Sequence, residues 1–463
     1  MRFFSASGPF WVFVQHGAGR IAVALKFLVL ARVLGNDGVG IIGVGLLAIV
    51  VAEALSELGL MQALVQRRGV LTQAQLSAVW GWQLLRAGLL GFVMVLFSWP
   101  VAQFFSMPEA FPVFMTVGLL LFLRGSVNLS ITLALRDMQM KRVGLFNAGF
   151  VILDALLGIL VAWLTRSVLA VFLTMLIAEA ARCIASYSVF PRPPRPTLSR
   201  EASEFAAFGK WIWINNVLVL LLNQSDKFII AKFFGVGDMG IYQISQRFAQ
   251  LGVADVGGML SQYLFPKLSE QMRVDQRAAV QLAFLLLLLL AAVGMVAVLA
   301  MCSIAENMFV FLLGEDWRVA GLVFEVLAFG MYGALLNSVL VPFIKAEGKV
   351  WIITCAMLLQ LVAFSVLLYF KWDDGIVGVA YASSMSVWLA TLLILIGSIC
   401  GVKYAAEFFS SQWRMWILLV FCSFVLMLPK ERWWLGGGVA FYVLLRSVYN
   451  LYGLIGKNEG RRR

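Results

Sequence analysis

Long apolar stretches separated by short polar loops follow one another along almost the whole chain. A membrane-spanning helix needs about 20 mainly apolar residues, and fourteen stretches of this kind can be identified. Their approximate bounds are 10–34, 40–65, 76–101, 113–135, 145–165, 168–190, 207–232, 240–265, 279–302, 319–344, 350–371, 376–400, 411–428 and 433–456. The pattern predicts an all-α, polytopic membrane protein with about 14 transmembrane helices. The first stretch carries Arg20 and Lys26 and is too long for a cleavable signal, so we expect it to be retained.

Composition supports this fold class and excludes several others. Hydrophobic residues make up 62% of the 463 residues and charged residues 13%, whereas soluble domains average about 45–50% and about 25%. So little charge cannot cover the surface of a soluble fold of this size, which excludes a cytosolic enzyme, a secreted protein and a disordered scaffold. The net charge of +12 would suggest nucleic acid in a soluble protein. Here it indicates basic cytoplasmic loops and an anionic partner in the bilayer, and no nucleic acid is expected.

The distribution of basic residues predicts the orientation in the membrane. The N-terminus, the loops after even-numbered stretches and the C-terminus hold about three times as many Lys and Arg as the other loops. Because basic loops stay in the cytoplasm, we expect both termini there, in agreement with an even number of helices. The predicted location is the cytoplasmic (inner) membrane of a bacterium.

An internal repeat and a proline-rich segment predict two six-helix lobes. The run Ala31–Ile41 recurs as Ala231–Ile241, with an offset of 200 residues, and each copy joins the first two helices of its half. Repeats of the same topology are common in transporters, with the substrate site between them. The stiff run Pro191–Pro196 stands between stretches six and seven. The expected organisation is a first lobe over 1–190, a linker over 191–206, a second lobe over 207–402, and two extra helices with a basic tail over 403–463.

Motifs in both halves resemble a known family. Those of the first half are Ala31–Gly35, Gly40, Leu55–Leu60 and Ala63–Arg67, and those of the second are Phe208, Gly209, Asn216, Asp226, Lys227, Gly235, Gly240–Tyr242, Arg247, Phe265 and Pro266. In this order they resemble the O-antigen and exopolysaccharide flippases of the multidrug/oligosaccharidyl-lipid/polysaccharide superfamily. The clear resemblance covers roughly residues 10–275. Glu57 and Ser245 depart from the more usual Asp and Ala, which leaves the subfamily and substrate open.

Fifteen ionisable residues fall within the proposed helices. Each central charge costs about 2.5–3.5 kcal/mol, so most should line a hydrated cavity or pair with one another. Glu179 and Arg182, three residues apart, are expected to form an ion pair on one helix face. The other candidates fall into two groups: the basic residues proposed to line a substrate cavity are Arg20, Lys26, Arg86, Arg124 and Arg247, and the carboxylates proposed for coupling or ion pairing are Glu53, Glu57, Asp154 and Asp255.

Two interpretations of the basic residues remain open from the sequence. An arginine-lined cavity suits a phosphate, because the guanidinium fork matches its oxygens. The alternative is local pairing of Arg20, Lys26, Arg86 and Arg124 with the few carboxylates of the same lobe. Metal binding and cofactors are not expected: His16 is the sole histidine, and the five Cys form no CxxC pattern.

The function that the resemblance implies is transport of a lipid-linked, polyprenyl diphosphate oligosaccharide or exopolysaccharide repeat unit by alternating access. The chain lacks the GxxxxGK[ST] motif of ATP-hydrolysing sites, so an ion gradient or downstream consumption should drive transport, and no enzyme activity is expected. The partners would be the lipid bilayer, an anionic lipid-linked oligosaccharide, and the polysaccharide polymerase and chain-length machinery. Two alternatives are a multidrug or organic-cation exporter of the same superfamily and a membrane glycosyltransferase or polymerase.

Overall fold

The structure is a computed structural model that describes residues 9–57, 59–66, 71–199, 201 and 203–401, with the single residues 404, 405, 407, 410 and 443. Over these residues the secondary structure is helical and contains no strand. Nine of the described helices are long and apolar enough to cross a membrane. The predicted all-α membrane fold is therefore confirmed. Predicted stretches 411–428 and 433–456 lie outside the described residues apart from Val443.

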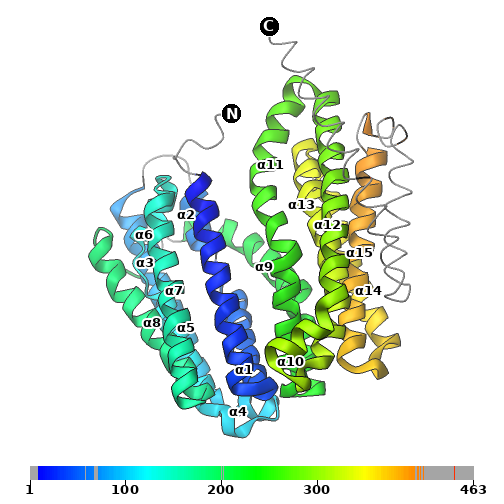
Figure 1. Ribbon diagram of the computed structural model, residues 1–463. Coiled ribbons are helices and arrows are strands. Elements are labelled where there is room, and N and C mark those ends of the chain that lie inside the picture. Colours follow the sequence, from blue (N-terminus) through cyan, green and yellow to red (C-terminus); the bar gives the residue numbers. More distant parts are fainter. Residues whose placement is uncertain are drawn as a thin grey trace. The chain divides into compact units, whose positions relative to one another are not determined.

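The chain divides into two compact units, Met1–Ile244 and Ser245–Arg463. The helices of the first are α1 (Pro9–Ser56), α2 (Leu60–Gln66), α3 (Gln73–Leu96), α4 (Ser98–Phe104), α5 (Phe111–Gly125), α6 (Ser130–Arg136), α7 (Met140–Thr165), α8 (Val168–Val189) and α9 (Ser203–Ile229). Helix α1 packs along α7, α3 along α5, and α8 against both α5 and α7 (Figure 1). These five helices form the bundle that holds the candidate site.

Two glycines of the internal repeat break the helices at equivalent positions. Helix α1 is too long for one span and is kinked at Gly35, where φ is 69° and ψ is −175°. Gly235, 200 residues later, has φ 98° and ψ 179° after the π-helical turn Ile230–Phe234, and α10 (Val236–Ala249) follows it. Only glycine readily adopts this backbone region. The kinks fall where the sequence predicts the loops between stretches one and two and between stretches seven and eight.

The two repeat copies also cross each other within the first unit. A Cβ placed on Gly40 would come 1.8 Å from the carbonyl oxygen of Val236. A Cβ placed on Gly240 would come 2.0 Å from the carbonyl oxygen of Asn36. Because 36 and 236, and 40 and 240, are related by the repeat offset, the crossing is symmetric in sequence. Glycine at both positions lets the two backbones touch.

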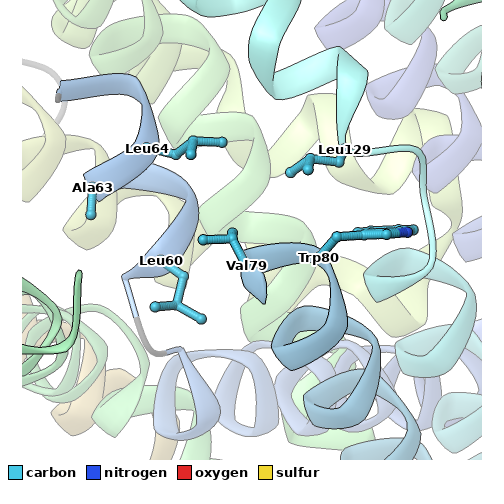
Figure 2. Close-up of a cluster of buried hydrophobic side chains, with 6 residues drawn as sticks. All are labelled: Leu60, Ala63, Leu64, Val79, Trp80 and Leu129. Carbon is cyan, nitrogen blue, oxygen red and sulfur yellow. The ribbon is translucent and has the colours of Figure 1, made fainter. Parts of the chain in front are cut away.

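A small apolar cluster fixes the short helix α2 against its neighbours. Leu60, Ala63 and Leu64 of α2 pack with Val79 and Trp80 of α3 and with Leu129 in the turn before α6 (Figure 2). The side chain of Thr72 accepts from the backbone N–H of Gln75, and the Gln75 side chain accepts from the N–H of Thr72, so that a capping box starts α3. Helix α3 is thereby held with its Arg86 near the end of α1.

The second unit is a bundle of long apolar helices. They are α11 (Asp255–Val274), α12 (Gln276–Leu313), α13 (Arg318–Glu347), α14 (Val350–Phe370) and α15 (Gly375–Gly401). Helix α13 packs against α11, α12 and α15, and α14 packs against α15 (Figure 1). Asp275 caps α12 by accepting from the N–H of Ala278, and Gly348 ends α13 in the left-handed conformation. The ends of α14 and α15 agree closely with predicted stretches 350–371 and 376–400.

The predicted lobe boundaries stay a prediction. The two compact units divide within α10, because α9 packs against α1 and α2 of the first unit. Part of the predicted linker 191–206 also lies on the first unit: the N–H of Thr197 donates to the carbonyl oxygen of Ser77, and the indole of Trp82 donates to that of Ser199.

Candidate functional site

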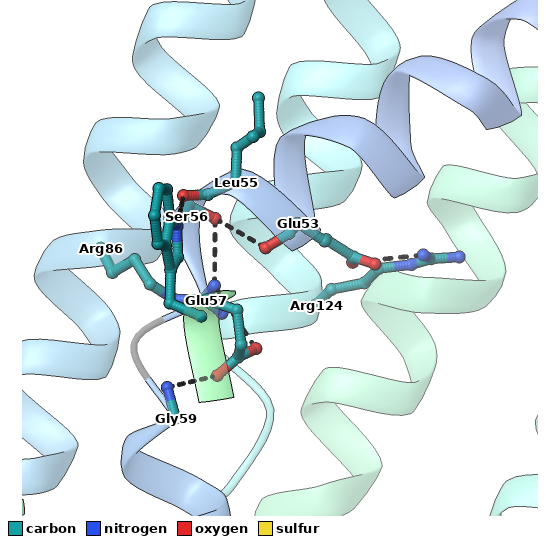
Figure 3. Close-up of polar contacts among 8 residues, drawn as sticks. Glu53, Leu55, Ser56, Glu57, Gly59, Arg86 and Arg124 are labelled. Atoms are coloured by element: carbon teal, nitrogen blue, oxygen red, sulfur yellow. Dashed lines mark hydrogen bonds and ion pairs between the residues drawn. The ribbon is translucent and has the colours of Figure 1, made fainter. Parts of the chain in front are cut away.

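Four charged side chains gather where α1 ends, between α1, α3 and α5 (Figure 3). Glu53 lies in the last turn of α1, and Glu57 follows directly after the helix end. The Nη1 atom of Arg124 is 3.3 Å from Oε1 of Glu53, and Nη1 of Arg86 is 3.7 Å from Oε2 of Glu57. Arg86 also donates to the hydroxyl of Ser56, over 3.1 Å. Two of the predicted basic residues are therefore paired with two of the predicted carboxylates.

Backbone contacts hold these carboxylates at the end of α1. The hydroxyl of Ser56 donates to the carbonyl oxygen of Glu53, and the N–H of Gly59 donates to Oε1 of Glu57 (Figure 3). Gly59 has a φ of 66°, a conformation that suits glycine and turns the chain into α2. The indole of Trp213, on α9, donates to the carbonyl oxygen of Leu55 over 2.8 Å. These contacts thus fix the position of the ion pairs at the end of α1.

A third ion pair lies farther from the C-terminal end of α1. Nζ of Lys26 is 2.9 Å from Oδ1 and 2.8 Å from Oδ2 of Asp154, on α7. The Lys26 side chain is only 5% exposed, and that of Asp154 is 26% exposed. Gly158 leaves room for the lysine, because a Cβ there would come 2.6 Å from its Cε. The carboxylate of Asp154 compensates the hydration that the lysine loses on burial.

The predicted pair on α8 is confirmed. Nη1 of Arg182 is 3.0 Å from Oε1 of Glu179 and donates to Oε2 over 3.3 Å. Glu179 is 12% exposed and Arg182 is 30% exposed. The spacing of three residues places both side chains on one face of the helix.

A cavity of about 370 Å³ lies among α5, α7 and α8. Its lining consists of Leu120 and Arg124 from α5, Asn147, Phe150, Val151 and Asp154 from α7, and Met175, Ala178, Glu179 and Arg182 from α8. The lining thus contains Arg124 and Asp154, each of which belongs to an ion pair with a residue outside the cavity. It also contains both members of the pair Glu179–Arg182. Its charged lining is balanced, with two guanidinium groups and two carboxylates.

The family model that matches the chain is described as polysaccharide biosynthesis protein and covers residues 29–321. This match spans more than half of the chain. The chain belongs to this family. The resemblance found in the sequence motifs is therefore confirmed.

Two curated relatives carry names that concern polysaccharides. The succinoglycan biosynthesis transport protein ExoT of Rhizobium meliloti (strain 1021) is 23% identical over 331 residues, which cover 70% of this chain and 66% of ExoT. The lipopolysaccharide biosynthesis protein WzxC of Escherichia coli (strain K12) is 22% identical over 416 residues, covering 88% of this chain and 82% of WzxC. The chain thus matches just under two thirds of the length of ExoT and most of WzxC.

Solved structures show the same fold. The lipid II flippase MurJ in an inward closed conformation aligns with a TM-score of 0.66 and 13% identity, covering 95% of this chain and 98% of MurJ. An inward-facing multidrug resistance MATE family transporter of the MOP superfamily aligns with a TM-score of 0.56 and 12% identity, covering 88% of this chain and 97% of that one. The polysaccharide biosynthesis protein therefore has the fold of this transporter superfamily.

The remaining predicted site residues are not brought into the cavity lining. Arg20 lies part-buried on α1, and Arg247 lies on α10 in the second unit. The side chain of Asp255 lies outside the described part of the structure. Within the described residues, no group of three His, Cys, Asp or Glu could hold a metal ion. The substrate role of the basic residues stays a prediction.

Sequence reasoning missed Asn128, which organises one end of the first unit of this family member. It is 1% exposed, and its amide group donates to the carbonyl oxygens of Ser186 and Pro191. Its backbone N–H donates to the hydroxyl of Ser186. A single amide within the apolar stretch 113–135 was the available signal, since a buried amide requires partners. This contact breaks the stretch into α5 and α6 and anchors the proline-rich segment.

Proposed function

We propose that this polysaccharide biosynthesis protein is a flippase that moves a lipid-linked oligosaccharide, carried on a polyprenyl diphosphate, across the bacterial cytoplasmic membrane. Membership of the family, the transport name of ExoT and the fold shared with the lipid II flippase MurJ support this proposal. The observation that carries it is the group of basic side chains held inside membrane-spanning helices of the first unit.

The pairs at the end of α1 suit the binding of a diphosphate. Each guanidinium group is already oriented by a carboxylate, at 3.3 Å for Arg124 and 3.7 Å for Arg86. A diphosphate offers more oxygens and more negative charge than the carboxylate it would displace. Arg86 and Arg124 would then exchange Glu57 and Glu53 for phosphate oxygens. The released carboxylates could accept a proton, which would couple binding to an ion gradient.

Transport in this proposal breaks no covalent bond and requires no cofactor. The head group binds from the cytoplasm, the protein passes through alternating access, and the lipid tail stays in the bilayer. Both termini lie in the cytoplasm. Glu53, Glu57, Asp154 and Asp255 are the candidate coupling carboxylates, and a polysaccharide polymerase with its chain-length machinery would receive the exported unit.

Export by neutralised variants tests the proposal. Arg86→Gln and Arg124→Gln should abolish export of surface polysaccharide at unchanged protein level, with repeat units accumulating in the inner leaflet. Arg→Lys should keep part of the export, because charge survives while the bidentate fork is lost. Arg192→Gln, an exposed residue of the same unit, is the matched control and should export normally.

The double variants separate substrate binding from structural pairing. If Arg86 binds the diphosphate, Arg86→Gln combined with Glu57→Gln stays inactive, and so does Arg124→Gln with Glu53→Gln. Full rescue of export by both double variants would contradict the proposed role, because it would show that each arginine serves only to balance its carboxylate. Loss of repeat-unit synthesis in a deletion strain would instead favour an enzyme.

A further inference from the structure

The cavity among α5, α7 and α8 has a size suited to a small ligand. Its volume of about 370 Å³ lies at the lower end of the roughly 300–1,000 Å³ range of ligand pockets. All of its lining residues lie between Leu120 and Arg182, so the cavity belongs to the first unit alone. A site of this volume takes one ring or two, and not a whole oligosaccharide.

The charges around the cavity exclude a strongly charged ligand. Arg182 is balanced within the wall by Glu179, Arg124 is balanced by Glu53, and Asp154 is balanced by Lys26. A phosphate entering the cavity would meet the carboxylates of Asp154 and Glu179 at close range. An ammonium group would meet two guanidinium groups. In a low-dielectric surrounding both encounters are unfavourable.

The same wall carries side chains that can donate and side chains that can accept hydrogen bonds. The guanidinium groups of Arg124 and Arg182 are donors, and the carboxylates of Asp154 and Glu179 are acceptors. The lining contains both donors and acceptors, so a suitable ligand both accepts and donates.

We propose that this cavity binds one uncharged sugar ring of the transported head group. A sugar hydroxyl donates and accepts at once, and it brings no charge to a balanced wall. Asn147 adds an amide with the same double capacity, and the ring of Phe150 can cover the apolar face of a pyranose. Carboxylates and guanidinium groups held in fixed pairs would thus select among sugars by the positions of their hydroxyl groups.

This inference rests on the proposed function. It assigns the sugar of the substrate to the cavity, and the diphosphate to the arginines near the end of α1. Arg124 belongs to both places, since it pairs with Glu53 at the end of α1 and lines the cavity. A diphosphate at Arg86 and Arg124 would therefore have its attached sugar within reach of α7 and α8.

Equilibrium binding to the purified full-length chain tests the inference. The probes are a panel of neutral hexoses and N-acetylhexosamines, glucose 6-phosphate, glucosamine, and farnesyl diphosphate as a sugar-free lipid diphosphate. We expect at least one neutral sugar to bind, about tenfold more tightly than the phosphorylated and amino sugars. Ala178→Leu, which fills the cavity, should weaken sugar binding about tenfold and leave farnesyl diphosphate binding unchanged.

The chain offers a matched control for this variant. Ala181→Leu makes the same change on α8, on the face that carries the exposed Ile177 and Ile184, and should bind both kinds of probe normally. Phe150→Leu, which keeps an apolar side chain, should weaken sugar binding about threefold to tenfold through lost ring contact. It provides a second test should Ala178→Leu fail to fold.

The outcomes separate this inference from the proposed function. Binding of farnesyl diphosphate with no binding of any neutral sugar overturns the sugar site and leaves the flippase proposal intact. Tighter binding of glucose 6-phosphate than of glucose overturns the sugar site as well. Absence of binding by both classes of probe counts against both proposals. Equal sugar affinity in the unchanged chain, Phe150→Leu and Ala178→Leu would place the sugar elsewhere.

Discussion

The two units of the chain place their ion pairs at different depths. In the first unit the pair Lys26–Asp154 joins α1 to α7, and the pair Arg86–Glu57 joins α3 to the residue after α1; Lys26 and Arg86 are only 5% and 14% exposed. In the second unit the described pairs lie at or near helix ends, and Arg277–Glu407 is 59% and 60% exposed. The same residue types are therefore buried to different degrees in the two units.

The difference follows from the cost of desolvation. A charge at a helix end keeps much of its hydration, so pairing adds little stability. A charge inside a bundle has lost its hydration, so pairing is a condition for burying it at all. Buried pairs are costly to keep and are typical of functional sites in membrane proteins. The contrast supports the proposal that the substrate binds in the first unit.

Removal of the most buried cation should have the largest effect. Lys26→Met leaves Asp154 without its cation inside the bundle, and we expect a loss of about 3–5 kcal/mol in the free energy of unfolding. Adding Asp154→Asn should recover most of this loss, because no unpaired charge remains. Denaturant unfolding in detergent measures both variants. A double variant no more stable than Lys26→Met would show that the lysine stem, and not the pair, stabilises this region.

A change of packing beside the pair should have a smaller effect. In Gly158→Ala the new Cβ would come 2.6 Å from Cε and 3.1 Å from Nζ of Lys26. The flexible lysine would move away from Asp154, and we expect a loss of about 1–3 kcal/mol. Gly149→Ala is the control on the same helix, because nothing lies within 4 Å of its new Cβ, and it should gain up to about 1 kcal/mol from helix propensity. Equal effects at both positions would contradict the packing argument.

Much of the fold could be predicted from the sequence because apolar length determines where a helix crosses a membrane. The bounds of α14 and α15 follow directly from two apolar runs. The repeat predicted equivalent junctions, and Gly35 and Gly235 break the helices there. The break between α5 and α6 was not predicted, because it depends on contacts of Asn128 with Ser186, 58 residues away.

The composition of the candidate site could be predicted, but its pairing could not. The cost of a charge in the membrane singled out Lys26, Arg86 and Arg124 before their positions were known. Their partners depend on helix packing: Lys26 and Asp154 are 128 residues apart, and Arg124 and Glu53 are 71 apart. Only the pair Glu179–Arg182 is local, and it was the one that helix geometry alone predicted.

The exposed pair Arg277–Glu407 should show little coupling. Its Nη2 and Oε1 atoms are 2.5 Å apart, yet both side chains are more than half exposed. A double-mutant cycle with Arg277→Gln and Glu407→Gln should give a coupling energy of about 0–1 kcal/mol. The same cycle at Lys26 and Asp154 should give a coupling energy several times larger. Equal coupling energies at the two sites would remove the distinction between the units.

The pair Lys371–Asp374, between α14 and α15, should give the smallest effect and a defined pH dependence. Nζ of Lys371 is 3.0 Å from Oδ2 of Asp374, and this hydrogen bond raises the pKa of Lys371 above its ordinary value of 10.5. Because the folded chain holds the proton more tightly than the unfolded chain, the pair stabilises the fold below pH 10.5, and this contribution is lost as the pH rises through the raised pKa. The unfolding midpoints of the unchanged chain and of Lys371→Met should therefore differ slightly near neutral pH and converge above pH 10.5. A difference that stays constant across this range would assign the effect to apolar contacts of the lysine stem and not to its charge.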